Sequence, residues 1–163
     1  MDPVTLAALG LSAFQLLSSQ SQADAIMGNA RLNNQINEMN AEFAELEAFD
    51  AIAQGYTEAA RYQTVIDKTI SSQQVAFASQ NIDVNFGSAK EIQKDTGVVG
   101  YLNTLDIQTQ ARNKAYGLNN EAGNIRLQGS VNDSQAAGNA AATKQAGILN
   151  AAATGLSGFN RTR

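Results

Sequence analysis

Proline occurs once in this 163-residue sequence, at position 3. Because the proline ring removes a helical hydrogen bond and clashes with the preceding turn, the residues after position 3 contain no obligatory helix breaker. The chain has 28 Ala and 15 Gln, and both residue types favour helix, Ala most strongly of all. Proline content and composition together predict an all-α protein.

The chain contains no Cys, no His and no Trp. These absences exclude disulfides, thiol nucleophiles, zinc sites built from Cys and His, and acid/base catalysis by histidine. Glu38, Glu42 and Glu45 fall close together on a helix, but carboxylates need an enclosing pocket to act as catalysts, so we expect a solvated acidic face. We therefore predict a structural or interaction protein and not an enzyme.

Glycine and acidic residues form no cofactor or metal motif. Gly97 and Gly100 lack the Gly-Lys-Ser/Thr sequence and the preceding strand of a phosphate-binding loop. Asp83, Asn85 and Asp95 do not have the spacing of a calcium-binding loop. We expect no cofactor, no metal and no small-molecule substrate.

The net charge is −4 at pH 7. Residues 1–80 hold 3 basic and 9 acidic side chains, whereas residues 81–163 hold 8 basic and 6 acidic ones. An acidic first half and an unclustered basic second half do not make a surface for tight phosphate binding. Direct contact with nucleic acid is therefore expected to be transient at most.

Residues 1–21 are predicted to form a short apolar helix followed by a polar break at residues 18–21, whose sequence is SSQS. The apolar stretch 4–17 is shorter than the ~20 residues that span a bilayer, and no basic segment precedes it as in a signal peptide. We expect it to dock on a partner, with membrane association as the alternative. Its large apolar residues are Leu6, Leu9, Leu11, Phe14, Leu16 and Leu17.

Residues 22–137 are predicted to form a long helical hairpin with a loop at 79–87. In the first arm, apolar residues recur at steps of three and four, which draws one stripe along a helix. The stripe residues predicted to form a helix–helix or oligomer interface are Leu32, Ile36, Met39, Phe43, Leu46, Tyr56, Ile66 and Ile70. A free helix of this length is not stable alone, so the stripe requires a partner.

The loop is indicated by Asn, Asp and Gly, which favour turns, in the sequence SQNIDVNFG. Gly87 ends it, and Ser88 stands three residues before Glu91, which is the pattern of a helix capping box. The second helix is therefore predicted to start at Ser88.

The second arm carries a heptad-like seam of mostly small residues. Its predicted interface residues are Ala111, Ala115, Leu118, Ala122 and Ile125, and the same steps continue through Gly129, Asn132 and Ala136. Small residues let two helices approach closely, so we expect large residues of the first arm to fill the space beside them. The whole is predicted to be an elongated antiparallel hairpin that assembles into a helical oligomer. For the Ala- and Gly-rich tail, residues 138–163, a continued helix, a loosely ordered segment and a membrane-adaptable segment all remain open.

The stretch FASQNIDVNFGSAKEIQKDTGVVGYLNTLDIQTQARNKAYGLNNEAGNIRLQG, residues 77–129, resembles the small internal virion proteins of short-tailed bacteriophages, the podovirus DNA-ejection family. The order of features carries the resemblance: a long Ala- and Gln-rich helix, a loop of the type Ser79 to Asp83 before Gly87, the Asp106-Ile107 step, the run Asn113 to Gly117, and an Ala/Gly-rich tail. Ala89 departs from the pattern, because proteins of this family often have Pro at the first helical position.

The resemblance implies a protein packaged inside the capsid near the portal and ejected into the host envelope on infection, where it helps to form a channel for the genome. It also implies a ring-like homo-oligomer whose neighbours are the portal protein and other internal core proteins, with transient contact with phage DNA and the host envelope. The alternative is a helical-hairpin subunit of a bacterial secretion filament or translocator, for which Ala/Gln-rich helices are equally natural. An envelope-degrading enzyme of the same system is disfavoured because the chain has no credible acid/base pair.

Overall fold

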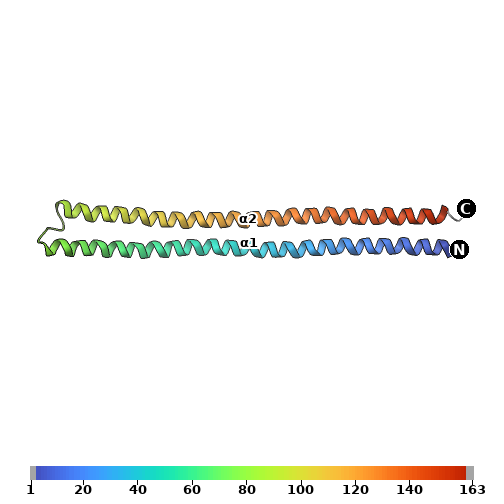
Figure 1. Ribbon diagram of the computed structural model, residues 1–163, viewed down its shortest axis with the longest axis horizontal. Helices are drawn as coiled ribbons and strands as arrows, with labels where there is room; N and C mark the ends of the chain where they lie inside the picture. Colours follow the sequence, from blue (N-terminus) through green and yellow to red (C-terminus); the bar gives the residue numbers. More distant parts are fainter. Residues whose placement is uncertain (1–2, 161–163) are drawn as a thin grey trace. The chain divides into compact units, whose positions relative to one another are not determined.

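The protein is a hairpin of two long helices, seen here in a computed structural model that describes residues 3–160, and the side chains of residues 10–157 (Figure 1). Helix α1 spans Pro3–Ser79 and helix α2 spans Gly87–Asn160. Within the described residues there is no β-strand. The all-α class and the helical hairpin predicted from the sequence are therefore confirmed.

Helix α1 continues without interruption through residues 18–21, so the expected polar break, and with it a separate N-terminal helix, was wrong. Two serine hydroxyls in this segment bond within the helix and do not compete with it: Ser18 Oγ donates to the Gln15 carbonyl at 3.0 Å, and Ser19 Oγ donates to the Leu16 carbonyl at 2.9 Å. Serine is only mildly unfavourable in a helix when its hydroxyl bonds back to the preceding turn. The C-terminal tail, which the sequence left open, is helical as far as Asn160.

The connection between the helices comprises residues 80–86. It uses two left-handed backbone conformations, at Asn81 (φ 57°) and Gly87 (φ 61°), the residue types that tolerate this region best. Gln93 Nε2 on α2 donates to the Val84 carbonyl at 3.0 Å, which ties the loop to the helix that follows it. Helix α2 starts at Gly87, one residue before the position predicted from Ser88 and Glu91.

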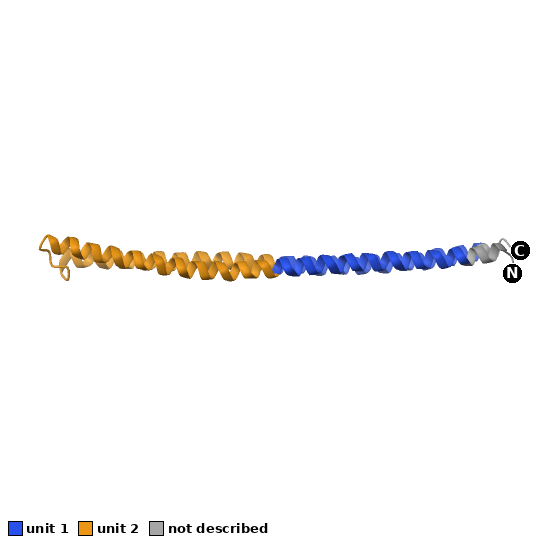
Figure 2. Ribbon diagram, turned by 90° about the horizontal axis from the view of Figure 1, so that it is seen from below, with its two compact units in different colours: residues 1–41, 123–163 blue, residues 42–122 orange. Residues whose placement is uncertain are grey.

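The chain divides into two units, coloured separately in Figure 2. Unit 1 consists of residues 1–41 and 123–163, and unit 2 consists of residues 42–122. In each unit a stretch of α1 packs against an antiparallel stretch of α2, and unit 2 contains the loop.

In both units, sets of three or four inward positions recur at intervals of 11 residues. In unit 2 this interval separates Ala89, Gly100, Ala111 and Ala122 on α2, and Ala44, Gly55, Ile66 and Phe77 on α1. In unit 1 it separates Ser19, Ala30 and Ala41 on α1, and Gly129, Ala140 and Ala151 on α2. Eleven residues in three turns give about 3.67 residues per turn, near the 3.6 of an undistorted helix. These positions therefore keep facing the partner helix without a left-handed supercoil.

Candidate interaction surfaces

The surface between α1 and α2, here called the inner seam, is built from very small side chains. Among the described residues, the buried hydrophobic side chains are Ile66 and twelve alanines: Ala23, Ala30, Ala41, Ala44, Ala48, Ala51, Ala59, Ala89, Ala115, Ala122, Ala140 and Ala151. Small residues at a helix–helix contact allow the two backbones to approach closely. Each alanine buries little apolar area, however, so the seam stabilises one chain only modestly.

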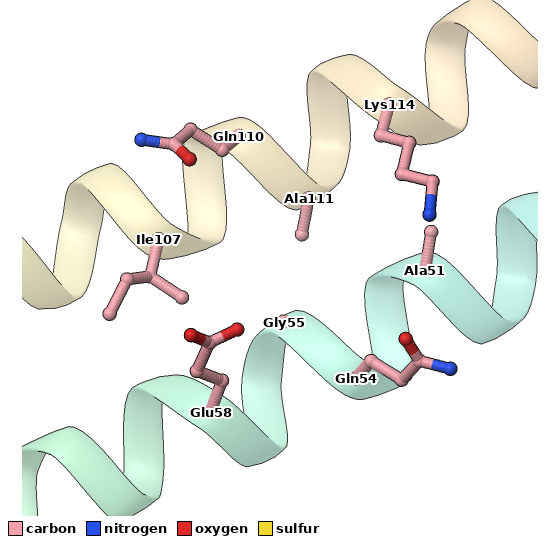
Figure 3. Close-up of a pocket in the computed structure, with 8 residues that line it drawn as sticks. All are labelled: Ala51, Gln54, Gly55, Glu58, Ile107, Gln110, Ala111 and Lys114. Carbon is pink, nitrogen blue, oxygen red and sulfur yellow. The ribbon is translucent and has the colours of Figure 1, made fainter.

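The closest approach in unit 2 is at Gly55. A Cβ atom placed on Gly55 would collide with the Cβ of Ala111, and the Cα of Ala111 would be 3.6 Å from it. Figure 3 shows the Ala111 methyl group pointing at the Gly55 backbone. Glycine is required here because the opposite helix already occupies the volume of a side chain.

Three further glycines are approached by α1 in the same way. A Cβ on Gly100 would be 2.6 Å from Cγ1 of Ile66 in unit 2. In unit 1, a Cβ on Gly129 would meet the side chain of Asn34, and one on Gly147 would collide with the side chain of Ser19. By contrast, Gly28, Gly117, Gly123, Gly138 and Gly155 have nothing within 4 Å of the position of a Cβ. The inner seam therefore depends on particular glycines and not on glycine content in general.

In unit 1, polar side chains join the two helices along one flank of the inner seam. Asn34 Nδ2 donates to Asp133 Oδ2 at 2.7 Å, Arg126 Nε donates to Glu38 Oε1 at 2.9 Å, and Lys144 Nζ lies 3.4 Å from Asp24 Oδ1. Both ion pairs are substantially exposed to solvent. Such pairs contribute little stability but fix the relative position of two elements.

In unit 2 the corresponding links are mostly neutral. Gln73 Nε2 donates to Thr96 Oγ1 at 3.0 Å, Asn103 Nδ2 donates to Tyr62 Oη at 2.8 Å, and Arg112 Nη2 donates to Tyr56 Oη at 3.0 Å. The hydrogen bond to Tyr56 raises the pKa of Arg112, a residue that is charged at every physiological pH in any case. These three bonds, spaced along unit 2, set the register of α1 against α2.

Two shallow hollows lie beside points where the helices come closest. The hollow in unit 2, of about 320 Å³, is lined by Ala51, Gln54, Gly55, Glu58, Ile107, Gln110, Ala111 and Lys114 (Figure 3). The hollow in unit 1, of about 300 Å³, is lined by Gln15, Ser18, Ser19, Gln22, Thr143, Ala146, Gly147 and Asn150. Ligand sites are concave and predominantly apolar and enclose most of the ligand. Neither hollow has this character.

No group of three or more Asp or Glu side chains in the described part of the chain is placed to hold a metal ion. Neither helix, over the residues searched, has a stretch apolar and long enough to cross a membrane.

The residues predicted for the second arm lie at or beside the inner seam. Ala115 and Ala122 are buried, and Ala111, Leu118 and Ile125 are partly buried. The predicted continuation is correct at Gly129, which is buried, but Asn132 is exposed and its neighbour Asp133 takes the inward position. The predicted pattern has a step of three residues after Gly129, to Asn132, whereas the structure has a step of four, to Asp133. The longer step places Asp133 11 residues after Ala122, in agreement with the 11-residue repeat.

Of the residues predicted for the first arm, Ile66 is buried and Ile70 partly buried. The other six are exposed: Leu32, Ile36, Met39, Phe43, Leu46 and Tyr56, with exposed fractions of 48–61%. The expectation that they fill the space beside the second arm was therefore wrong. Ala41 and Phe43 show the reason, because residues two apart point in nearly opposite directions on a helix, and Ala41 is the one that faces α2. Whether these six side chains contact another molecule stays a prediction.

The apolar residues near the N-terminus also face outward where they are described. Leu11, Phe14, Leu16 and Leu17 have exposed fractions of 41–69%. Leu6 and Leu9 lie outside the residues whose side chains the structure describes. The sequence analysis missed the seam alanines of the first arm, because a search for large apolar residues passes over them. The recurrence of Ala and Gly every 11 residues is the signal that identifies them.

Because many large apolar side chains of both helices face outward, the chain has a large solvent-accessible surface. It exposes 11528 Å², whereas a compact monomer of 17.2 kDa exposes about 7,800 Å². The difference is of the order of the area buried in large permanent protein–protein interfaces. The chain therefore exposes more surface than a compact monomer of its mass.

No protein-family model, curated protein sequence or solved structure shows significant similarity to this chain.

Proposed function

We propose that this chain is a structural internal virion protein of a short-tailed phage. In this proposal it belongs to the core near the portal inside the capsid and is ejected into the host envelope, where it contributes to the channel for genome delivery. It acts as a ring-like homo-oligomer with the portal protein and other core proteins as neighbours, and it touches phage DNA and the host envelope only transiently. It is not an enzyme and takes no cofactor.

The observation that carries the proposal is the inner seam, in which the two long helices pack mainly through alanine and glycine. Among residues 10–157 no large side chain is fully buried, Ile66 retaining 8% exposure. The loss of large buried side chains accounts for the highest energetic costs of disrupting a protein core. A chain whose described seam has few large buried side chains, and which contains no cysteine to form disulfides, can be unfolded for passage through a narrow channel at modest cost and can reform by local helix formation.

Two further features support the proposal. The resemblance of residues 77–129 to the podovirus DNA-ejection family supplies the biological setting. The exposed apolar side chains of α1 and α2 supply surfaces on which further copies and core proteins can pack.

Quantitative mass spectrometry of purified particles, before and after triggered genome release, tests the proposal. The major capsid protein and the portal protein, which stay with the emptied particle, serve as internal standards. We expect this chain to be present at a fixed copy number in full particles and to be lost from emptied ones. Its absence from full particles would contradict the proposal and favour the secretion-filament or translocator alternative.

A further inference from the structure

In unit 1, the face of α1 directed away from α2 carries an apolar stripe without charge. The stripe, here called the outer stripe, consists of Phe14, Leu17, Ser21, Ala25, Gly28, Leu32, Ile36 and Met39. Its five large side chains have exposed fractions of 54–69%. Large exposed patches of this kind mark sites of association.

The spacing of residues in the outer stripe is the same in both directions along the chain. Its steps along the chain are three, four, four, three, four, four and three residues, with large side chains at both ends and small ones in the middle. A contact between identical copies related by a two-fold axis requires such a self-complementary surface. In an antiparallel pair centred between Ala25 and Gly28, the opposing residues are Phe14 and Met39, Leu17 and Ile36, Ser21 and Leu32, and Ala25 and Gly28. The small central residues allow close approach, and Leu32 enters the space left by Ser21.

Charge placement agrees with the same pairing. Asp24 and Arg31 flank the outer stripe on one side, because residues seven apart lie on nearly the same side of a helix. In the antiparallel pair, Arg31 of each copy lies beside Asp24 of the other. Because Asp24 also lies 3.4 Å from Lys144 of its own chain, each acidic side chain then has a basic neighbour on either side. A parallel pair would instead place equal charges at the same level, which is unfavourable.

We propose that the outer stripe is the binding site for a second copy of this chain, in an antiparallel two-fold dimer. The large accessible surface favours a permanent contact of this kind. A two-fold contact closes a dimer, so a ring requires a second contact between dimers, for which the outward apolar residues of α2 in unit 1 are available: Leu127, Val131, Leu149 and Leu156. The proposed function assumes that copies of the chain associate, and this dimer specifies one contact by which they do so. The dimer proposal rests on the proposed function in this point alone. The tests below use the purified full chain and so fail or succeed independently of its location in a virion.

A charge exchange tests the pairing. Arg31→Glu places two acidic residues beside each other at two symmetry-related places near the two-fold axis, and we expect the dimer dissociation constant, measured by sedimentation equilibrium at low salt, to rise about 10-fold to 100-fold. The triple variant Asp24→Arg/Arg31→Glu/Lys144→Glu exchanges the charges across the contact and keeps opposite charges at positions 24 and 144 of the same chain; it is expected to return the constant to within about 3-fold of the original. Arg61→Glu, the same change at an exposed residue of unit 2, serves as the control and should have no effect. Equal weakening in the single and the triple variant would overturn the pairing.

Because the chain has no Cys, a single introduced thiol reports on the symmetry of the contact. Ala25→Cys lies next to the proposed axis and is expected to form a disulfide-linked dimer under mild oxidation, whereas Ala60→Cys, at an exposed alanine of unit 2, is not. Linkage of Ala25→Cys only to Ala141→Cys, on the outward face of α2, would replace the two-fold contact with a head-to-tail one. A monomeric chain that binds vesicles of phosphatidylcholine and phosphatidylglycerol would overturn the proposal and assign the outer stripe to lipid.

Discussion

Single glycines determine how closely the two helices pack. At Gly55 the Cβ of Ala111 occupies the place of a side chain, whereas nothing lies within 4 Å of a Cβ on Gly117. Both residues are in the interiors of helices in unit 2, so they share the same unfavourable helix propensity and differ only in their surroundings. Comparing substitutions at Gly55 and Gly117 therefore distinguishes the effect of glycine on helix propensity from its effect on helix packing.

We expect Gly117→Ala to stabilise the protein by about 1 kcal/mol, because alanine is the better helix former. Gly55→Ala gains the same propensity but forces the helices apart, and overpacking of a tight contact costs about 1–3 kcal/mol. Urea denaturation followed by circular dichroism measures both. Equal stabilisation by the two substitutions would show that α1 and α2 do not approach each other at Gly55.

Residue size explains what the sequence analysis predicted and what it missed at this scale. Ala115 and Ala122 were predicted because the pattern in the second arm consists mostly of small residues. Ala44 and Ala48 were missed because Phe43 and Leu46 draw a more hydrophobic stripe on the opposite face of the same helix. A single sequence does not show which of two stripes faces its own hairpin and which faces another molecule.

At the scale of the elements, each helix has two apolar faces with different side chains. The inward face consists mainly of small residues that recur at intervals of 11, with Ile66 as a buried exception, and the outward face carries most of the large apolar residues. The long helices and the loop were predictable, because the absence of proline and the turn residues near Asn81 act locally. The break expected at residues 18–21 was wrong because polar residues alone do not end a helix when their hydroxyls bond to the preceding turn.

A charge in the inner seam should separate the helices. Ala115 is 2% exposed, and a carboxylate at this position would be buried without a partner, which destabilises a protein by several kcal/mol. We predict that Ala115→Asp abolishes cooperative thermal unfolding or lowers its midpoint by more than about 10 °C. Asn113→Asp introduces the same charge two residues away at an exposed position and should change the midpoint little. Similar midpoints for the two variants would place Ala115 outside the seam.

The loop makes a second prediction at this scale. Gly87 has φ 61°, a region that costs a residue with a Cβ roughly 1–2 kcal/mol, and nothing within 4 Å obstructs a side chain there. Gly87→Ala should therefore lower the free energy of unfolding by about 1 kcal/mol through the backbone alone. Gly87→Asn, a residue that tolerates this region, should lower it by less. Chemical denaturation compares the two, and an unchanged stability in Gly87→Ala would mean that α2 starts in another conformation.

At the scale of the whole molecule, the chain combines a modest inner seam with a large exposed surface, which explains why its proposed role is one of assembly. It also has no His and no Cys, so it lacks the side chains that ordinarily titrate between pH 5 and pH 8 or so. We expect the midpoint of thermal unfolding to change by less than about 3 °C between pH 6 and pH 8 at fixed protein concentration. A larger change, measured by circular dichroism, would point to a carboxylate buried by assembly.

The central claim is that the small residues face inward and the large apolar residues face outward. Ala48 and Phe49 are neighbours on α1 with exposed fractions of 2% and 70%, and the absence of native cysteine makes thiol labelling selective. The most direct measurement is the rate at which a maleimide reagent labels Ala48→Cys and Phe49→Cys in the folded protein, with urea-unfolded samples as the reference. The account predicts rapid labelling at position 49 and at least about 100-fold protection at position 48, as expected for a site that reacts only after local opening. Equal rates, or protection at position 49 with rapid labelling at position 48, would contradict it.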